Sequence, residues 1–410
     1  MHQNIQNLVK LASKPERMII GLMSGTSMDG LDIALCLIKG SGRDTQFELK
    51  AFTTIDYTND FKEKILSIFS KEMVALETLC LLNAWVGRQH GKMVLDALTS
   101  WNITPDRVDM IASHGQTIYH APKSLHPHSE YDPATLQIGD GDHIAVTTGI
   151  LTLSDFRQKH IAAGGEGAPL AVYGDYLLCS HPTQNRLLLN MGGIANFTYL
   201  EAGCSLDQVF STDTGTGNTL MDAYTRTHFA PLAYDKDGAI AAAGKINAAL
   251  LSELKAHSFF SLVLPKTIGP ELFNLEFLSK AQIASNTLDL SPQDVMATLN
   301  RFSAETIADC INSSIPNGTT FNMYSSGGGM HNPVLMAHLN HLLPNATLFS
   351  SQEIGINPDA KEAILFALLA NEAVAGTPLF AGGHATKIPI TMGKISFPLE
   401  VYLNKIHILK

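Results

Sequence analysis

The segment Ser24-Gly-Thr-Ser-Met-Asp-Gly30 concentrates groups that can bind phosphate, because it places three hydroxyls, a carboxylate and two glycines between two apolar, strand-like runs. Such a turn lets phosphate oxygens approach backbone N–H groups closely. It lacks the G-x-x-x-x-G-K-[ST] pattern of a Walker A loop. We predict that its backbone N–H groups and the hydroxyls of Ser24, Thr26 and Ser27 bind the β- and γ-phosphates, and that Asp29 holds Mg²⁺ directly or through water. The alternative is an ordinary hairpin in which the Asp-Gly pair supplies the positive φ.

Two more glycine turns repeat this design. Gly192-Gly193 lies inside the strand-like run 186–200, and Gly327-Gly328-Gly329 follows the apolar run 321–324. The Gly192-Gly193 turn, like the Ser24–Gly30 turn, has a strand-like run on each side. We therefore interpret the chain as a duplicated fold that holds a nucleotide between its two halves.

A carboxylate begins the segment Asp213-Thr-Gly-Thr-Gly-Asn218, which follows the strand-like run 209–212. Such a carboxylate, at a strand end beside a glycine turn, is well placed to act as a general base or to bind a metal. Gly215 and Gly217 cost backbone entropy, which indicates close approach by a ligand. The segment does not match G-x-G-x-x-G, because a leucine occupies the third glycine position. The alternative is that Asp213 caps the following helix.

Four further polar side chains are candidates for binding a small molecule. Gln116 and Thr117 end a strand-like run, where polar groups of α/β sheets commonly line ligand crevices. Arg157 also follows a strand-like run and has the geometry to bind a carboxylate or phosphate with two parallel hydrogen bonds. Glu362, in the first turn of an expected helix, either favours the positive end of the helix dipole or faces the ligand. His114 is expected to be structural, since no nucleophile motif accompanies it.

Composition restricts the class of protein. The chain has 410 residues, of which 45% are hydrophobic, so two cores are expected. The formal net charge is −10 and no Lys/Arg-rich run occurs, which argues against a nucleic-acid partner. The five cysteines show no C-x-x-C pattern, as expected for reduced thiols in a cytoplasmic protein. We find no signal peptide and no run that approaches the ~18 apolar residues of a membrane span.

The predicted elements follow the same order twice, which indicates an α/β fold of mixed sheets with helices packed on them. The expected strands are 18–23, 31–38, 48–55, 108–113, 136–138, 151–156, 186–191, 195–200 and 207–212. The expected helices include 61–70, 73–99, 168–179 and a helix that begins at Ser291-Pro292 and runs to about 312. We predict one lobe from residues 1–150 and about 385–410, and a second lobe from 151–384.

Taken together, the motifs closely resemble the anhydro-N-acetylmuramic acid kinase family, of the sugar-kinase/actin/Hsp70 ATPase superfamily. They run in the order of that family across about residues 18–395. The segments that carry the resemblance are 21–32, 113–117, 155–157, 164–170, 190–196, 213–222 and 327–329. The resemblance implies a two-lobed actin-like (ribonuclease H-like) fold, with duplicated mixed β-sheets flanked by helices and a nucleotide cleft between the lobes.

The same resemblance implies a cytoplasmic enzyme of peptidoglycan recycling that uses ATP and Mg²⁺. Such kinases open the 1,6-anhydro ring of anhydro-N-acetylmuramic acid with water and phosphorylate O6, giving N-acetylmuramic acid 6-phosphate and ADP. Asp213 matches the general base and Glu362 matches an acidic residue at the sugar site, so we expect both to be catalytic. Gln116, Thr117 and Arg157 match sugar-contacting positions. The expected ATP contacts are Ser24, Gly25, Thr26, Ser27, Met28, Asp29, Gly30, Leu31, Gly192, Gly193, Asn196, Gly215, Gly217, Gly327, Gly328 and Gly329. A homodimer is also implied.

Two features depart from the family pattern. Glu166 stands where family members usually carry glutamine, which exchanges a neutral amide for a charge. Residues 1–16 form an N-terminal extension. Two other functions remain as alternatives: a nucleotide-gated binding or assembly protein like actin and Hsp70, and a kinase of another sugar. Sugar-dependent release of ADP separates the first alternative from the predicted enzyme, and incorporation of water at C1 separates the second.

Overall fold

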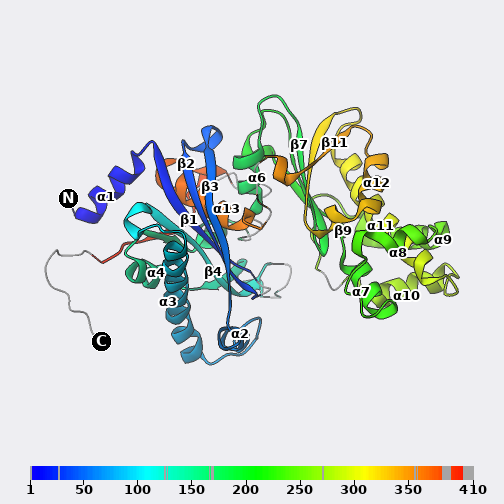
Figure 1. The fold of residues 1–410 in the computed structure, drawn as a ribbon, viewed down its shortest axis with the longest axis horizontal. Coiled ribbons are helices and arrows are strands. Elements are labelled where there is room, and N and C mark those ends of the chain that lie inside the picture. Colours follow the sequence, from blue (N-terminus) through cyan, green and yellow to red (C-terminus); the bar gives the residue numbers. More distant parts are fainter. Residues whose placement is uncertain are drawn as a thin grey trace. The chain divides into compact units, whose positions relative to one another are not determined.

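The computed structural model describes residues 2–25, 28–123, 126, 128–165, 167, 170–269, 272–354, 357, 359–380 and 389–399. The chain forms two compact units (Figure 1). Unit 1 consists of Met1–Leu178 and Asp359–Lys410, and unit 2 consists of Cys179–Pro358.

Unit 1 is built on a seven-stranded mixed sheet with the strand order β14-β6-β4-β1-β2-β3, in which β5 also pairs with β4. The first three strands form an antiparallel meander, while β4 runs parallel to β1 and β6 runs parallel to β4. The strands are β1 (Glu16–Ser24), β2 (Gly30–Lys39), β3 (Gln46–Asp56), β4 (Met110–Ala121), β5 (Ala134–Ile138), β6 (Thr152–Ser154) and β14 (Lys394–Ser396).

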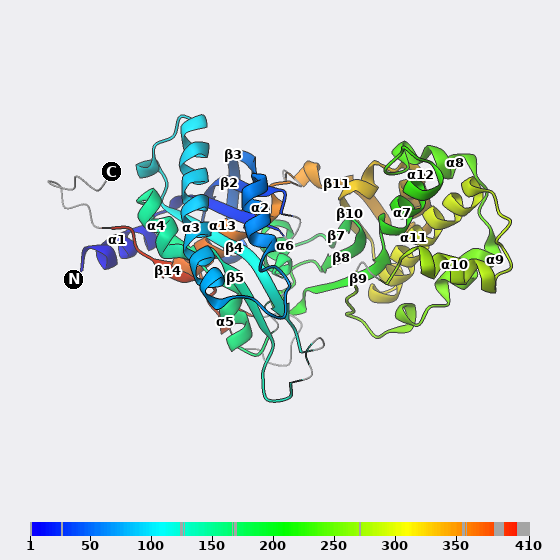
Figure 2. The ribbon, with the colours of Figure 1, turned by 90° about the horizontal axis from the view of Figure 1, so that it is seen from below.

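Helices cover both faces of this sheet (Figures 1 and 2). The helices of unit 1 are α1 (Gln3–Ala12), α2 (Asn59–Leu66), α3 (Leu76–Ser100), α4 (Gly141–Thr148), α5 (Phe156–Ala162), α6 (Ala171–Cys179, which ends at the border with unit 2) and α13 (Lys361–Ala375), with the short 3₁₀ turns η1 (Gly42–Asp44) and η2 (Pro105–Arg107). Ile20 and Leu22 of β1 join the core beneath α2, α3 and α4. Gly21, between them, faces α13, where an added Cβ would lie 1.8 Å from the Ala363 carbonyl oxygen. Glycine therefore lets α13 contact the strand backbone, which fixes the start of that helix.

Unit 2 repeats the same topology. Its sheet has the order β11-β10-β7-β8-β9, with β7, β8 and β9 antiparallel, β10 parallel to β7, and β11 parallel to β10. The strands are β7 (Arg186–Met191), β8 (Ile194–Leu200), β9 (Phe210–Thr216), β10 (Phe321–Ser326) and β11 (Ala346–Ser350). In both units, counted along the chain, the five main strands follow the order 3-2-1-4-5. The predicted duplication of a mixed sheet flanked by helices is thus confirmed.

The helices of unit 2 enclose two apolar clusters. The helices are α7 (Thr219–His228), α8 (Ala239–Ala243), α9 (Ala248–Lys255), α10 (Leu275–Ala284), α11 (Pro292–Ser314) and α12 (Pro333–Leu342), with short 3₁₀ turns at η3 (Leu206–Gln208), η4 (Lys236–Gly238), η5 (Ser258–Ser261), η6 (Gly328–His331) and η7 (Ser351–Ile354). One cluster joins α11 and α12 to the sheet, and the other joins α7, α9, α10 and α11. The predicted start of α11 is confirmed, because the Ser291 hydroxyl accepts a hydrogen bond from the Asp294 N–H and Pro292 occupies the first turn.

The contact-defined units differ from the predicted lobe boundaries at 150 and 385. The segment 151–157, taken as the start of the second lobe, supplies β6, which pairs with β4 in the first sheet. The helix α13 lies far along the chain but packs on β1 of unit 1. A two-stranded ribbon, β12 (Leu379–Phe380) with β13 (Pro389–Ile390), follows α13. Long-range packing therefore moves both boundaries, and local composition carries no signal of it.

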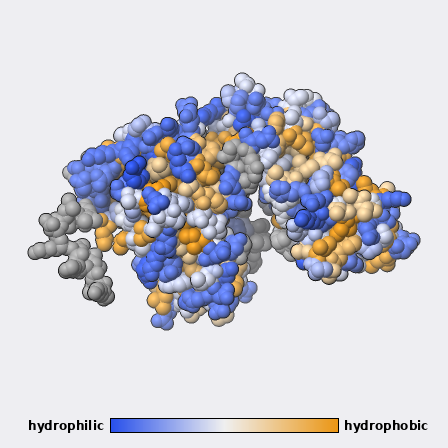
Figure 3. Space-filling view, viewed as in Figure 1, coloured by the Kyte–Doolittle hydropathy of each residue, from blue (hydrophilic) through white to orange (hydrophobic). Residues whose placement is uncertain are grey.

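None of the helices in the ranges given above is both long enough and apolar enough to cross a bilayer. The face drawn in Figure 3 is largely hydrophilic, with hydrophobic residues dispersed over it. None of the five cysteines forms a disulfide.

Candidate active-site residues

The turn between β1 and β2 is held by side chains that point into unit 1. Ser24, the last residue of β1, is 1% exposed, and its hydroxyl lies 2.5 Å from Oε1 of Gln116 and 2.7 Å from the hydroxyl of Tyr57. Gln116 is completely buried, and its amide nitrogen donates to the carbonyl oxygens of Gly25 and Thr117, each at 3.2 Å. Ser24 and Gln116, predicted to contact phosphate and sugar respectively, are thus partners of each other.

The far side of this turn combines buried and exposed residues. Met28 adopts a positive φ of 54° and its side chain is 5% exposed. Asp29 is exposed, and its backbone carbonyl accepts from the Tyr57 N–H at 3.0 Å. Leu31 is fully buried in the core of unit 1, so its side chain does not face a ligand. Thr26 and Ser27, two of the predicted phosphate ligands, lie outside the described residues.

Arg157 is the centre of a second group in unit 1, at the beginning of α5. Its Nε donates to Nε2 of His114 at 2.9 Å, and its Nη1 donates to the Gly167 carbonyl at 2.7 Å. His114 is buried, and burial together with the nearby Arg157 charge lowers the pKa of His114 to about 3. It therefore stays neutral and orients Arg157, in agreement with the structural role predicted for it. Thr117 is half-buried, and its hydroxyl accepts from Gln137 at 3.3 Å.

Glu362, in the first turn of α13, is electrostatically coupled to Arg157. Part of the Glu362 side chain is exposed, yet desolvation by the surrounding protein is the largest cause of its raised pKa. Arg157 opposes this rise, and the carboxylate of Asp32 adds to it. Asp32, on β2, has a raised pKa for the same main reason and accepts a hydrogen bond from the Thr54 hydroxyl. The pKa of Glu362 is thus influenced by one guanidinium, that of Arg157, and by one further carboxylate, that of Asp32.

Three glycine turns meet at one end of the unit 2 sheet. The N–H groups of Gly217 and Asn218 donate to the carbonyl oxygens of Gly193 and Gly192, both at 2.8 Å. The Asn218 side chain donates to the carbonyl of Met191 at 3.0 Å. A Cβ added at position 327 or 329 would lie 2.7 Å from atoms of Met191. The predicted ATP-contacting glycines 192–193, 217 and 327–329 are therefore brought together, whereas a Cβ added at Gly215 would face Phe260 and Thr306.

Asp213 lies within β9 and not after its end, because the strand continues to Thr216. It pairs in register with Asn196 of β8. The carboxylate oxygen Oδ2 accepts from the Ile268 N–H at 2.9 Å, and the Asp213 N–H donates to the Lys266 carbonyl at 3.0 Å. Partial burial raises the pKa of Asp213, and the hydrogen bond from Ile268 opposes that rise. A carboxylate oriented by the backbone and with a raised pKa has the properties of a general base.

The alternative role of Asp213 as a helix cap is wrong, because Asn218 occupies the N-cap position of α7. Sequence reasoning also missed Tyr57 and His90. Tyr57 follows β3 without any motif, and His90 lies in the middle of α3, where a buried histidine gives no signal of function. Asp32 was within reach of sequence reasoning, since it follows Asp29 by three residues in the same motif.

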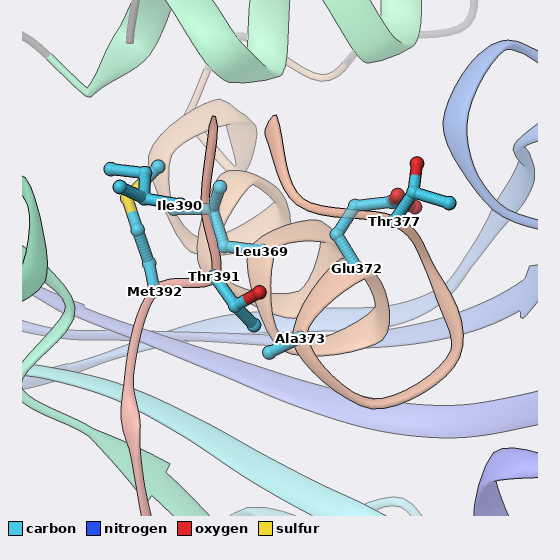
Figure 4. Close-up of a pocket in the computed structure, with 7 residues that line it drawn as sticks. All are labelled: Leu369, Glu372, Ala373, Thr377, Ile390, Thr391 and Met392. Carbon is cyan, nitrogen blue, oxygen red and sulfur yellow. The ribbon is translucent and has the colours of Figure 1, made fainter. Parts of the chain in front are cut away.

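Neither metal ligation nor cavity shape adds further residues to the candidate site. Within the described ranges, no group of three or more His, Cys, Asp or Glu side chains is arranged to hold a metal ion. Mg²⁺ in kinases is commonly held by one or two carboxylates together with substrate phosphates, so the exposed Asp29 fits such a role without a protein cage. Glu166 lies outside the described residues. A small pocket shown in Figure 4 lies beside the second half of α13 and is lined by Leu369, Glu372, Ala373, Thr377, Ile390, Thr391 and Met392, none of them a predicted site residue.

The duplicated 3-2-1-4-5 sheets, each with a turn after its first strand, define the actin-like class of ATPases and sugar kinases that the sequence predicts. Comparison with known proteins is more specific. The family described as anhydro-N-acetylmuramic acid kinase matches residues 17–395. The anhydro-N-acetylmuramic acid kinase of Pseudoalteromonas atlantica is 58% identical over 400 residues, which cover 97% of this chain and 100% of that protein.

Two more relatives with the same name agree over nearly the whole chain. That of Pseudoalteromonas translucida is 56% identical over 399 residues, covering 97% of this chain and 100% of the relative. That of Caldanaerobacter subterraneus is 37% identical over 399 residues, covering 96% and 100%. The chain belongs to the anhydro-N-acetylmuramic acid kinase family. It is thus a kinase that transfers the phosphoryl group of ATP to an alcohol.

Proposed function

We propose that this protein opens the 1,6-anhydro ring of anhydro-N-acetylmuramic acid with water and phosphorylates O6, giving N-acetylmuramic acid 6-phosphate and ADP in a Mg²⁺-dependent reaction. The observation that carries the proposal is Asp213, a carboxylate with a raised pKa that a backbone N–H holds beside the cluster of glycine turns. The relatives at 58% and 37% identity are both named anhydro-N-acetylmuramic acid kinase, which supports the proposed substrate.

Asp213 is proposed as the general base. It takes a proton from the water molecule that attacks C1 of the sugar, so that a new C1–O bond forms as the C1–O6 bond breaks. The electron pair of the broken bond stays on O6, which attacks the γ-phosphorus and displaces ADP. The proton passes from Asp213 to solvent after the step. Each bond that breaks is thereby matched by one that forms.

The other predicted residues take roles in binding. The glycine turns of unit 2 present backbone N–H and carbonyl groups that a phosphate or ribose can approach closely. In unit 1, Gly25 and Met28–Gly30 contribute backbone groups, and Asp29 would hold Mg²⁺, which neutralises phosphate charge when bound. Arg157, Glu362 and Thr117 are proposed to contact the sugar, whose carboxylate suits the Arg157 guanidinium. Gln116 acts from the interior, because its side chain is fully buried.

The proposal includes a cellular compartment and an oligomeric state. The absence of disulfides among the five cysteines agrees with a reducing, cytoplasmic compartment, where the protein would serve peptidoglycan recycling. A homodimer is proposed from the family resemblance, and its mass in solution tests it.

The deciding experiment measures ADP release from ATP and Mg²⁺ with and without anhydro-N-acetylmuramic acid, in ¹⁸O-labelled water. We expect ADP only when the sugar is present, with the label at C1 of the phosphorylated product. ADP release that ignores the sugar would contradict the proposal and favour a nucleotide-gated binding protein. Sugar-dependent release without label at C1 would instead indicate simple phosphorylation of another hydroxyl.

A further inference from the structure

We propose that Tyr57, supported by His90, is a positioning residue that fixes both ends of the β1–β2 turn and commits the Ser24 hydroxyl to the protein interior. The turn then meets phosphate through backbone N–H groups and not through Ser24. This inference rests on the proposed function for its ligand, ATP, but the hydrogen-bonded chain that carries it lies wholly within the described residues of unit 1.

The direction of the chain follows from Gln116. Its amide nitrogen faces two carbonyl oxygens, those of Gly25 and Thr117, which only accept hydrogen bonds. The amide must therefore place its nitrogen there and its oxygen toward Ser24. Because Oε1 has no hydrogen, the contact of 2.5 Å requires that the Ser24 hydroxyl donates to Gln116. Ser24 has only one hydroxyl proton, and this contact uses it.

Tyr57 and His90 continue the chain in one direction. The Tyr57 hydroxyl lies 2.7 Å from Ser24 Oγ, and since the Ser24 proton is committed to Gln116, Tyr57 must be the donor. Tyr57 in turn accepts from Nε2–H of His90 at 2.9 Å. Burial lowers the pKa of His90 to about 4, so the ring is neutral at pH 7. The Nε2–H tautomer leaves Nδ1 of His90 as an unpaired acceptor, which buried sites tolerate better than an unpaired N–H.

The backbone of Tyr57 holds the other end of the same turn. Its N–H donates to the Asp29 carbonyl at 3.0 Å, while its hydroxyl reaches Ser24 at the start of the turn. The ring is kept in place by Phe61, which stacks on it with the centroids 3.9 Å apart and 11° between the planes. One buried residue, 4% exposed, thus connects Ser24 with Asp29.

A consequence follows for the ligand. Phosphate oxygens of ATP at neutral pH accept hydrogen bonds, and Ser24 has no remaining proton to donate to them. Ser24 therefore does not donate its hydroxyl proton to phosphate in the way that the sequence predicts, but acts on the phosphate only by holding the turn. Removing the Tyr57 hydroxyl should loosen the Ser24 end of the turn, since the backbone bond to Asp29 remains, and should weaken the binding of ATP with a smaller effect on the sugar.

The test compares Tyr57→Phe with Tyr173→Phe. Tyr173 is a matched control, since it is also buried in unit 1 but its hydroxyl has no hydrogen-bond partner within the described residues. We expect Tyr57→Phe to raise the KM for ATP by about five- to tenfold, as for the loss of one buried hydrogen bond, with the sugar KM changed less than twofold. Hydrogen exchange of peptides that span residues 24–31 should become faster in Tyr57→Phe and stay unchanged in Tyr173→Phe.

His90 supplies a second pair of variants. In His90→Gln the side-chain amide retains a donor for Tyr57, whereas His90→Leu has none. We expect His90→Gln to keep most of the affinity for ATP, with hydrogen exchange of residues 24–31 as slow as in the unchanged protein. We expect His90→Leu to resemble Tyr57→Phe in both measurements. If Tyr57→Phe does not fold, this pair decides the question.

Equal exchange and equal ATP KM in Tyr57→Phe and Tyr173→Phe would overturn the inference. So would identical loss in the two His90 variants, which would indicate a packing effect. If the unchanged protein fails to release ADP with the sugar, the proposed function fails, and the exchange measurement still decides whether Tyr57 braces the turn.

Discussion

The turn between β1 and β2 in unit 1 and the turn between β7 and β8 in unit 2 occupy equivalent points of two sheets with the same strand order. They are stabilised by different means. In unit 1, the side chains of Tyr57 and Gln116 hold Ser24 at the start of the turn. In unit 2, the backbone N–H groups of Gly217 and Asn218 hold the carbonyls of the Gly192-Gly193 pair.

This difference explains the unequal residues at the two turns. A turn that is held by side chains needs polar side chains of suitable length that are buried beside it. It does not need a second backbone in close contact, so the turn can contain more residues. A backbone brace needs two main chains in close contact, so a Cβ at Gly217 would lie only 2.3 Å from the Gly192 carbonyl oxygen. Duplication is therefore visible in the order of elements but not in residue identity, because each half satisfies its turn with different chemistry.

We propose different tasks for these two groups of residues. Unit 2 combines the glycine turns with the carboxylate of Asp213, whereas unit 1 contributes charged side chains such as Arg157 and Glu362. If this division is correct, variants in unit 2 should affect turnover and nucleotide binding, and Arg157 variants should affect the sugar.

The largest effect is expected from Asp213→Asn. Loss of a general base should lower kcat by roughly 10²- to 10⁴-fold. Asparagine keeps an oxygen that can accept from the Ile268 N–H, so the fold and the binding of a non-hydrolysable ATP analogue should persist. Sugar-dependent ADP release and calorimetric titration with the analogue measure the two quantities. Near-normal turnover would remove Asp213 from the mechanism and break the proposed division between the units.

The pH dependence of the same variant gives an independent check. Because the pKa of Asp213 is raised, kcat/KM of the unchanged protein should fall as the pH drops through that raised value, when the base becomes protonated. Folding favours the protonated form of the Asp213 carboxyl. Its contribution to the free energy of unfolding is therefore present below the ordinary carboxyl pKa and is lost as the pH rises through the raised pKa of the folded protein. In Asp213→Asn, the residual kcat/KM should therefore no longer fall as the pH drops through this range, and Tm at pH 7 should not be lowered.

Much of the unit 2 cluster could be predicted from sequence, because glycine turns after strands are local patterns and parallel topology gathers them at one end. Residues that act through tertiary contacts could not. Gln116 at a strand end predicts a ligand contact, but a register shift between Leu22 and Ser24 sets Ser24 beside it, and the pair is buried. Tyr57 resembles any core aromatic residue until Ser24 and His90 are placed around it.

The predicted lobe boundaries differ from the bounds of the two compact units for a related reason. The sequence around residues 357–362 resembles an ordinary helix start, and nothing local indicates that α13 returns to the first sheet. That return depends on Gly21, about 340 residues earlier in the chain, which leaves room for the backbone at Ala363. Contacts between residues so far apart in the chain can be identified only from the folded structure.

A smaller effect, confined to one substrate, is expected from Arg157→Ala. The guanidinium is oriented by His114 and Gly167, and loss of a charged hydrogen bond costs about 1.5–3 kcal/mol, or roughly 10- to 100-fold in KM for the sugar. The KM for ATP should change less than threefold. Arg107→Ala is the matched control, since Arg107 is exposed in the same unit. Equal weakening of both substrates would contradict a sugar-side role for Arg157.

The smallest change, and the sharpest test of the backbone brace, compares two Gly→Ala variants that lie in contact. Gly217→Ala forces a Cβ against the Gly192 carbonyl and should lower stability by about 1–3 kcal/mol, measured as a fall in Tm. At Gly192 the nearest atoms to an added Cβ are 3.7 Å away and φ is not left-handed, so Gly192→Ala should change the free energy of unfolding by no more than an ordinary surface substitution, about 0.5 kcal/mol.

The methyl group of Gly192→Ala nevertheless adds bulk where the nucleotide is proposed to approach, and the KM for ATP should rise. If Tm falls equally in both variants, close backbone packing does not distinguish Gly217. If Gly192→Ala changes neither Tm nor KM, the nucleotide does not approach this turn, and its glycines serve only the fold.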